Sequence, residues 1–429
     1  MRILKHPDFV MISRLSRSCL LAAAILLFAL TAANAPAEWF VYYLNPDDLP
    51  GSGGEVTVGF QHAGYMYTGD GCGDERRAAL WNGTSDEWID LHPPGFRNSS
   101  LKGTNGVQQA GSVLPESQLR YHAALWSGTA ESFVDLHPAG ASESNAYAIG
   151  GDEQVGAVHF NSPPRAGLWR GTRESFVNLN PADSEFSVAL DTNGVQQAGY
   201  MLYDYLHGDS HAALWSGTAE SFVDLHPAGA IGDSAAFGIS PSGNQVVGYV
   251  QVRVGEYEDY HAAIWRTETD GWVDLNPPGA IFSSARATDG MHQAGQAYAG
   301  EGVYYTYRAY FWEGSVDTRV DLHALLPQQY TMSEAESVYT DGAGVWVCGY
   351  SHRTVVQCNR AILWFRPHEL PGDLDFDHDV DITDLATLLA AYGACIGEPE
   401  FNRLADIQSS GCIDIADLAS LLSNYGGME

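Results

Sequence analysis

The residues best suited to chemistry in this chain are the aspartates near its C-terminus. In the segment GDLDFDHDVDITDLATLLAAYG, residues 372–393, a carboxylate recurs at almost every second position. Ca²⁺ takes six to eight hard oxygen ligands, so this spacing predicts a twelve-residue calcium loop. Aspartates stand at loop positions 1, 3, 5, 9 and 12, and position 7 would offer a backbone carbonyl: Asp373, Asp375, Asp377, Asp381, Asp384 and, at position 7, Asp379. Because the ion would relieve the repulsion between so many anions, we expect folding and binding to be coupled.

A second copy of this loop follows 33 residues later, in the segment ADIQSSGCIDIADLASLLSNYG. The equivalent positions are occupied by Asp406, Gln408, Ser410, Cys412, Asp414 and Asp417. This copy supplies three carboxylates where the first supplies five, which predicts weaker calcium affinity. Gly411 stands at its sixth position, where a left-handed backbone is favoured, whereas the first loop has His378 there.

Each loop leads into a segment with the apolar spacing of an amphipathic helix. We expect one apolar face in each helix, formed by Leu385, Leu388, Leu389 and Tyr392 in the first and by Leu418, Leu421, Leu422 and Tyr425 in the second. An acidic disordered tail would not repeat these apolar residues twice in register with the acids.

Two loop–helix units of this form resemble a type I dockerin. The resemblance covers residues 372–426 and rests on loop length, acid positions and the pattern DLAxLL, which all coincide twice. It implies a small all-α domain over residues 372–429 that docks onto a cohesin partner, often in polysaccharide breakdown. Residues 10 and 11 of each loop would contact the cohesin: Ile382, Thr383, Ile415 and Ala416. His378 and the depleted second loop depart from the pattern, so a calcium-stabilised end domain without a docking role is the alternative.

Upstream of this module, a repeat organises the chain. A tryptophan recurs at spacings of 45, 43, 46, 50, 47 and 52 residues, at Trp81, Trp126, Trp169, Trp215, Trp265, Trp312 and Trp364. The twenty residues HAALWSGTAESFVDLHPAGA even occur twice without change, at residues 122–141 and 211–230. Each unit contains four short strands bounded by Gly, Pro, Asn and Asp, which is typical of a β-propeller blade. An open stack of the same units is the alternative.

The first residues after the N-terminal leader predict how the propeller closes. The segment EWFVYYLNP, Glu38–Pro46, resembles the outer-strand segments ESFVDLHP and ESFVNLNP, while Pro367 and Pro371 interrupt the outer strand of the seventh unit. The N-terminal strand is therefore expected to complete the last blade and remove the free edge. The prediction is an all-β, seven-bladed propeller over residues 38–366 and a linker at residues 367–371.

The units also resemble extracellular HAF repeats. The consensus HAF-L-W corresponds to His122–Trp126, DLG to Val134–Leu136, and the G-Q-V-V-G strand to Gln245–Gly248. Members of this type mostly have no known activity, so the resemblance implies export and a repeat architecture and little else.

Residues shared by the units are expected to be scaffold. The histidines of HAA and DLHP could suggest a ring of metal ligands, but Asn180 and Asn276 replace the second histidine in two units, which predicts structural imidazoles. The loops after the second strand differ and are rich in tyrosine. Aromatic side chains there would stack on sugar rings or anchor a protein; the candidates are Tyr203, Tyr205, Tyr257, Tyr260, Tyr304 and Tyr305. Tyrosines that merely cover strand surfaces are the alternative.

The N-terminus predicts export. Basic residues precede the apolar run CLLAAAILLFAL, and APA ends at Ala37, so residues 1–37 have the pattern of a signal peptide. A retained anchor is the alternative; after cleavage we expect no membrane insertion. A net charge of −32 excludes nucleic acid as a natural partner. Export permits disulfides, and proximity in sequence suggests Cys348–Cys358 and Cys395–Cys412, leaving Cys72 over.

Taken together, the sequence favours a secreted, calcium-binding protein whose propeller binds a ligand or serves a structural role. It would be displayed or docked through the dockerin-like domain, with polysaccharide utilisation as the implied setting. The alternative is a carbohydrate-active propeller enzyme, a glycoside hydrolase or lyase. Neither GxSxG nor HExxH occurs, so catalytic residues stay unassigned.

Overall fold

The computed structural model describes residues 39–427, with the exception of residues 47, 70, 73–74, 229, 267–270, 302–303, 354–357, 376 and 378. Trp39–Glu429 forms one compact unit. The signal-peptide prediction falls on residues outside the described part. No helix among the described residues is long and apolar enough to cross a membrane.

The described chain up to Pro367 is built from strands, which form five four-stranded sheets and one eight-stranded sheet. The first two sheets contain β2 (Gly51–Thr57), β3 (Gln61–Tyr67), β4 (Arg76–Asn82) and β5 (Trp88–Asp90), then β6 (Phe96–Thr104), β7 (Gln109–Pro115), β8 (His122–Trp126) and β9 (Val134–Asp135). The next two contain β10 (Glu143–Gly150), β11 (Glu153–His159), β12 (Arg165–Trp169) and β13 (Val177–Asn178), then β14 (Phe186–Thr192), β15 (Gln197–Leu202), β16 (His211–Trp215) and β17 (Val223–Asp224).

The eight-stranded sheet consists of two groups of four strands. The first group is β18 (Ser234–Ile239), β19 (Gln245–Val254), β20 (Tyr257–Arg266) and β21 (Trp272–Asp274); the second is β22 (Phe282–Thr288), β23 (Gln293–Glu301), β24 (Tyr304–Trp312) and β25 (Val320–Asp321). A single parallel bridge between Tyr260 and Phe282 joins them. The last sheet has the order β1 (Phe40–Tyr43), β28 (Asn359–Pro367), β27 (Gly344–Arg353) and β26 (Tyr330–Asp341).

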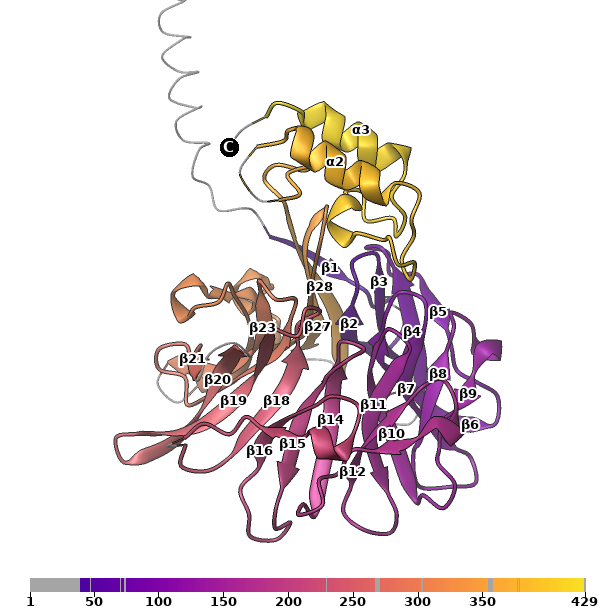
Figure 1. The fold of residues 1–429 in the computed structure, drawn as a ribbon, viewed down its shortest axis with the longest axis vertical. Coiled ribbons are helices and arrows are strands. Elements are labelled where there is room, and N and C mark those ends of the chain that lie inside the picture. Colours follow the sequence, from indigo (N-terminus) through magenta and orange to yellow (C-terminus); the bar gives the residue numbers. More distant parts are fainter. Residues whose placement is uncertain are drawn as a thin grey trace, which may run out of the picture. The chain divides into compact units, whose positions relative to one another are not determined.

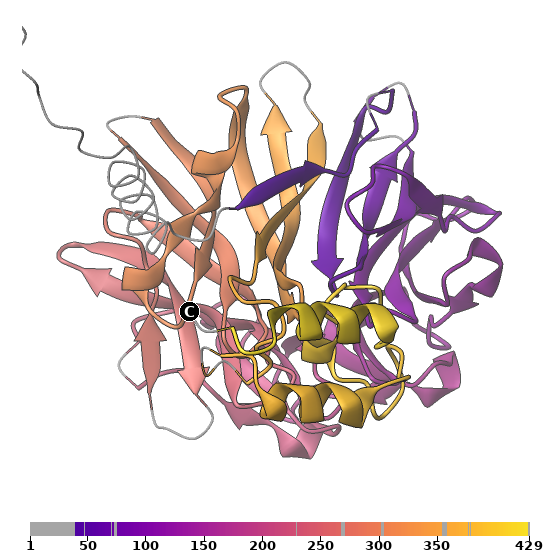
Figure 2. The same ribbon diagram turned by 90° about the horizontal axis from the view of Figure 1, so that it is seen from above.

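Consecutive sheets pack face to face, and the first sheet also packs against the last, so that the sheets form a ring (Figures 1 and 2). Strand β2 lies against β27 and β28, and the Thr57 amide donates to Ser337 Oγ at 3.2 Å. The N-terminal strand β1 pairs antiparallel with β28, with Val41 opposite Trp364. The last sheet is thus completed by the first strand of the described chain, as the segment EWFVYYLNP predicts. A closed ring of such sheets is a β-propeller.

A buried serine on each innermost strand ties its sheet to the preceding one. The serine Oγ accepts a hydrogen bond of 2.8–3.0 Å from the backbone N–H of an alanine on the third strand of that preceding sheet. Without it, a buried amide would lose its partner. The pairs are Ser52 with Ala361, Ser99 with Ala78, Ser144 with Ala123, Ser187 with Ala166, Ser234 with Ala212, Ser283 with Ala262, and Ser333 with Ala309.

The histidine of DLHP takes part in the same link. Nδ1 of His92 and of His137 lies 2.8 Å from the serine Oγ, and in the units with asparagine Ser187 donates to Asn180 Oδ1 at 2.7 Å. Since the serine oxygen already accepts from an amide, its proton is directed at these acceptors. Burial lowers the pKa of His92 and His137, which favours the neutral ring that can accept. The imidazoles are therefore structural, and asparagine can replace them because it offers an equivalent acceptor.

Every inner strand is interrupted by a β-bulge at the same place. The register shifts by one residue there, so one residue has no partner across the ladder. The second strand always has a glycine opposite the bulge, because a Cβ would overlap the carbonyl oxygen of the inner strand. These glycines include Gly111 and Gly199 of the repeated QQAG segment and Gly248 of VVG. The full set is Gly64, Gly111, Gly156, Gly199, Gly248, Gly295 and Gly349.

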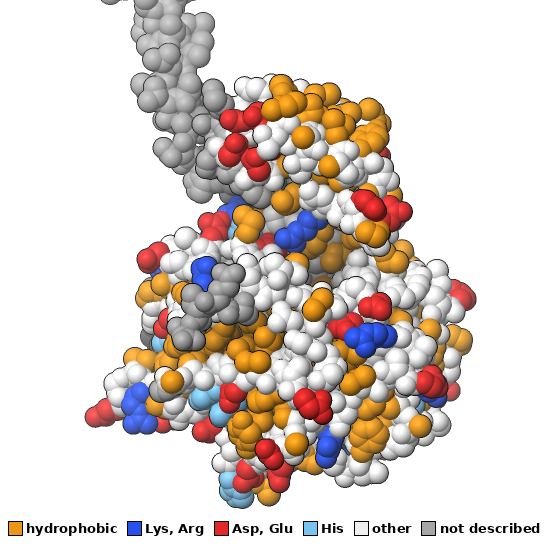
Figure 3. All heavy atoms as spheres, in the orientation of Figure 1, with side chains coloured by type: hydrophobic (Ala, Val, Ile, Leu, Met, Phe, Trp, Pro, Cys, Tyr) orange, Lys and Arg blue, Asp and Glu red, His pale blue; other side chains and the backbone are white. Residues whose placement is uncertain are grey.

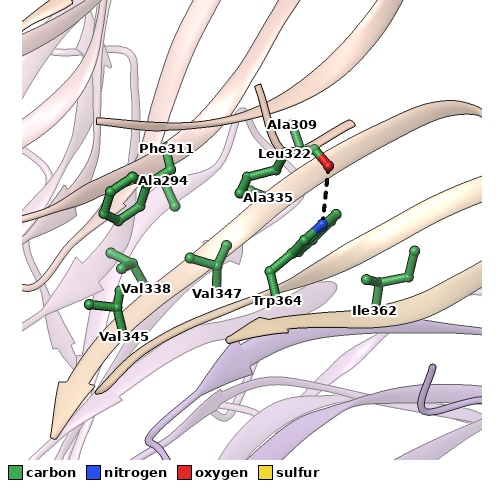
Figure 4. Packing of buried hydrophobic residues seen from close by; sticks show 10 residues of the cluster. All are labelled: Ala294, Ala309, Phe311, Leu322, Ala335, Val338, Val345, Val347, Ile362 and Trp364. Carbon is green, nitrogen blue, oxygen red and sulfur yellow. Dashed lines mark hydrogen bonds between the residues drawn. The ribbon is translucent and has the colours of Figure 1, made fainter. Parts of the chain in front are cut away.

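The hydrophobic core lies between neighbouring sheets. Each of the clusters there contains one tryptophan of the sequence repeat, and each of these tryptophans is at least 95% buried. Figure 4 shows the cluster between the β22–β25 group and the last sheet, where Trp364 Nε1 donates to the Leu322 carbonyl at 3.2 Å. The repeated tryptophans are therefore packing residues that fill the space between sheets.

After Pro367 the chain forms a small domain with two helices, α2 (Ile382–Ala391) and α3 (Ile415–Asn424). Leu388 and Leu421 are fully buried in its own core. Hydrogen bonds attach it to a turn between the first and second strands of the last propeller sheet. The Gly342 amide donates to the Arg403 carbonyl at 3.1 Å, and Ser409 Oγ donates to the buried Asp341 carboxylate.

One predicted disulfide is wrong. Cys72 pairs with Cys358, Cys395 pairs with Cys412 as expected, and Cys348 is buried and free. Cys348 lies in the middle of β27, where it packs into the interface between the last and first sheets. Cys358 lies just before β28, close to Gly51 of the first sheet. Proximity in sequence misled because the ring brings residues 286 positions apart together.

We expect Ser144→Ala to lower the free energy of unfolding by about 1–3 kcal/mol, because it leaves the Ala123 amide buried without a partner. Urea denaturation would measure the loss. The control is Ser242→Ala at an exposed turn, expected to change stability by less than about 0.5 kcal/mol. Equal effects of the two substitutions would contradict the role of the serine link.

The histidine position should tolerate asparagine but not a residue without an acceptor. His137→Asn is expected to keep most of the stability, since Asn180 serves this role in the neighbouring unit. His137→Leu removes the acceptor for Ser144 and should cost about 1–3 kcal/mol, measured by the same denaturation. If both variants lose the same free energy of unfolding, the hydrogen bond to Ser144 does not contribute to stability at this position.

Candidate functional site

The first predicted calcium loop brings its aspartates into two groups. The carboxylate oxygens of Asp373, Asp375 and Asp377 lie within 4.8 Å of one another, and so do those of Asp379, Asp381 and Asp384. Each of the six predicted ligands of this loop therefore belongs to one of two groups, and the members of each group are close enough to share an ion. His378, at the sixth position of this loop, lies outside the described part.

The start of helix α2 positions the second group. Asp381 caps the helix and accepts from the Thr383 amide at 2.6 Å. Asp384 is fully buried, and it accepts from the amides of Leu374 and Asp381 at 2.6 and 2.8 Å. The backbone thus holds these two carboxylates, whereas Asp375 and Asp377 are exposed.

The electrostatics of the first loop fit a cation. Partial desolvation and the neighbouring Asp377 raise the pKa of both Asp375 and Asp379. Asp379 Oδ1 is buried and has no hydrogen-bond partner among the described residues. A set made only of carboxylates, with one orphaned oxygen, suits a hard divalent ion such as Ca²⁺.

The second loop is already satisfied by the protein. Asp406 is buried and accepts from the amides of Ser410 and Gly411, both at 2.8 Å. Asp417 accepts from the amides of Gln408 and Asp414, also at 2.8 Å, and Ser410 Oγ donates to the Cys412 carbonyl at 2.9 Å. Gly411 has a φ of +85°, as its position requires. Within the described residues, a group of three carboxylates occurs in the first loop and not in this one.

The predicted partner residues begin the two helices and are exposed. Ile382 and Ile415 are 63% and 66% exposed, and Thr383 and Ala416 beside them are exposed as well. Figure 3 shows hydrophobic side chains gathered over the two helices. The capping aspartates hold the backbone of the first turn of each helix, from which these side chains project.

The predicted helix faces are wrong in part. Leu388 and Leu421 are buried, and Leu385 and Leu418 pack against the same core. The other four predicted residues are 45–52% exposed, namely Leu389, Tyr392, Leu422 and Tyr425. Helix α2 ends at Ala391 and α3 at Asn424, so both tyrosines follow a helix rather than continuing its face. The regularly spaced apolar residues therefore form two surfaces, one in the core of the domain and one exposed on its outside.

Four candidate tyrosines have described side chains, and no ring contact among the described residues joins any two of them. Tyr203 and Tyr205 are 45% and 47% exposed after β15, and Tyr257 is 76% exposed at the start of β20. Tyr260 is partly buried against Tyr249, with ring centroids 5.3 Å apart. Tyr304 and Tyr305 belong to β24, but their side chains lie outside the described part.

Sequence reasoning missed a cavity at the centre of the ring. It has a volume of 170 Å³ and is lined by the bulge residue of every inner strand: Glu55, Lys102, Tyr147, Leu190, Phe237, Arg286 and Glu336. Each stands three positions after the serine that links the sheets. That spacing was a usable signal, because the serine recurs in all units while the bulge residue differs in nearly every one.

The fold and the two-helix domain define a β-propeller with a C-terminal acidic module. No protein-family model matches the chain, and no curated protein matches it. Among solved structures, it is similar to the β-propeller domain of the Trilobed protease from Pyrococcus furiosus, at 9% identity and a TM-score of 0.48 over 77% of this chain and 94% of that chain.

Two further solved structures are similar to this chain. TolB from Acinetobacter baumannii is 12% identical with a TM-score of 0.38, over 72% of this chain and 70% of that one. Acylaminoacyl peptidase from Pyrococcus horikoshii is 10% identical with a TM-score of 0.47, over 79% of this chain and 53% of that one. This chain therefore spans about half the length of the peptidase. The assignment as a propeller rests on the strand pairing described above.

We expect Ca²⁺ to raise the melting temperature of the C-terminal domain and a chelator to lower it, as calorimetry of the full chain would show. At a calcium concentration of about 100 times Kd the gain is about 2.7 kcal/mol. Replacing both Asp375 and Asp377 by Asn should abolish this response, while raising stability without calcium because the repulsion falls. The control is Asp86→Asn with Glu87→Gln, outside the loops. A melting profile that ignores the chelator would exclude the site.

Proposed function

We propose that this chain is a secreted, calcium-binding modular protein in which a seven-bladed β-propeller acts as a binding or structural module. A dockerin-like domain, residues 372–429, would attach it to a cohesin-like partner, with polysaccharide utilisation as the setting. The observation that carries the proposal is the duplicated exposed surface of the two helices. Equivalent apolar residues are exposed at steps of 33 positions: Ile382 and Ile415, Leu389 and Leu422, and Tyr392 and Tyr425.

This surface is hard to explain as part of a free end domain. Six large apolar side chains, each 45–66% exposed, lie on two short helices or directly after them. Soluble monomers seldom keep contiguous apolar surface without a partner to cover it. The same positions are apolar in both copies, although the calcium loops before them have diverged. The recurrence of these apolar positions in both copies supports a docking role over simple calcium stabilisation.

The remaining parts of the proposal have separate support. The strand pairing supports seven blades if the eight-stranded sheet is divided at its single parallel bridge. Two disulfides, Cys72–Cys358 and Cys395–Cys412, support an oxidising compartment and hence export. The exposed aromatic side chains of Tyr203, Tyr205 and Tyr257 support a role in contacting a glycan.

A panel of type I cohesin domains tests the docking proposal by titration calorimetry in calcium and in chelator. We expect binding in calcium only. Ile382→Asp combined with Ile415→Asp should abolish it, because both copies of the surface then carry a charge where an apolar contact is needed. The control is Leu119→Asp, which places the same charge on an 83% exposed leucine of the propeller. Absence of binding to every cohesin, or binding that survives the double substitution, would reject the proposal.

A further inference from the structure

The central cavity divides into an apolar side and a charged side. Its apolar side is formed by the bulge residues of β10, β14 and β18, which are Tyr147, Leu190 and Phe237. Its charged side is formed by the bulge residues of the other inner strands, in the spatial order Arg286, Glu336, Glu55 and Lys102. The neighbouring Asp191 carboxylate is held by the amides of Thr192 and Ile239, at 2.8 and 2.9 Å.

The two charge pairs on that side differ. Lys102 Nζ contacts Glu55 Oε1 at 2.7 Å, so this pair satisfies itself. Arg286 Nε and Glu336 Oε2 are 4.0 Å apart, too far for a hydrogen bond. Arg286 Nε is buried and has no hydrogen-bond partner among the described residues, and its guanidinium lies over the Phe237 ring at 4.7 Å. Burial raises the pKa of Glu336 to about 7, which Arg286 opposes and Glu55 reinforces.

An open pair of this kind needs a molecule with two opposite charges close together. Arg286 Nε is buried without a partner among the described residues, which is unfavourable, so the gap between Arg286 and Glu336 favours an occupant that contacts both. Arginine binds carboxylates through two parallel hydrogen bonds, and a carboxylate accepts from an ammonium group. A carboxylate and an ammonium on adjacent positions would therefore match the neighbouring Arg286 and Glu336.

We propose that the central cavity binds an α-amino acid with a small apolar side chain. Its carboxylate would pair with Arg286, its ammonium with Glu336, and its side chain would pack against Tyr147 and Leu190. A water molecule takes up about 30 Å³ in the liquid. The cavity of 170 Å³ therefore has room for roughly six waters' worth of ligand, which is the size of a small amino acid.

Other small molecules fit the two sides less well. A pyranose carries hydroxyl groups around its whole rim, so some of them would be buried against Leu190 and Phe237 without partners. A simple amine or a simple carboxylic acid would satisfy one member of the Arg286–Glu336 pair and leave the other open. This binding is independent of the C-terminal domain, so it can hold or fail whatever the outcome for calcium and docking.

A ligand series on the unmodified chain tests the proposal by titration calorimetry. L-Valine and L-leucine are expected to bind. Two analogues of leucine each lack one charged group: 4-methylpentanoate lacks the ammonium and 3-methylbutylamine lacks the carboxylate. Each should bind at least about tenfold more weakly, since one lost charged hydrogen bond is worth about 1.5–3 kcal/mol. No binding of either amino acid at millimolar concentration, equal binding of an analogue, or tighter binding of D-glucose would overturn the proposal.

Variants then locate the site. Arg286→Gln and Glu336→Gln are each expected to weaken amino-acid binding at least about tenfold. The matched control is Arg253→Gln with Glu258→Gln, which removes an exposed pair, 3.1 Å apart, on the β19–β20 hairpin. Circular dichroism checks that each variant is folded. If a variant does not fold, the ligand series on the unmodified chain still tests whether an amino acid binds. Unchanged affinity in folded Arg286→Gln and Glu336→Gln proteins would place the binding elsewhere and overturn the assignment.

Discussion

The structure depends on one hydrogen bond repeated around the ring, from an alanine amide to the serine of the next inner strand. It fixes the distance between neighbouring sheets near their inner edge, where the ring is narrowest. Among the described residues, the serine hydroxyl in six of the seven links also bonds to a histidine or asparagine that precedes the same inner strand. Sheet spacing and loop position are thereby set by one hydroxyl group. The tryptophans fill the wider space outside it, so polar contacts determine the geometry and apolar contacts supply most of the stability.

Much of this scaffold was readable from the sequence because it is repeated. Trp126 and Trp215 recur with the period of the sheets, and Asn180 in place of histidine already indicated a structural role. The alternation of acids in residues 373–384 likewise predicted which side chains gather together. The cavity was not predicted, because a bulge is visible only when the register of both strands is known. Tyr147 and Arg286 look unremarkable in a linear sequence, and the shared serine three positions earlier becomes informative only once its partner is known.

Two failures have a common physical reason. The pairing of Cys348 with Cys358 assumed that nearby residues meet, and the single helix face assumed that all apolar residues of a helix point inward. In both cases the tertiary arrangement, which the local sequence does not reveal, decided the outcome. Cys358 meets the first sheet because the ring closes, and Leu389 and Leu422 face outward because the core of a two-helix domain is too small to cover them.

Completion of the last sheet by strand β1 has a consequence for folding. Strand β1 pairs with a strand that is made more than three hundred residues later, so the ring cannot close until β28 has left the ribosome. Until then the last sheet lacks its outer strand, and the first sheet lacks the neighbour that donates to Ser52. Closure is therefore a late, long-range event of the slow kind, and the Cys72–Cys358 bond can form only after it. Once closed, the ring opens only if both the strand and the disulfide are released, which favours persistence over rapid exchange.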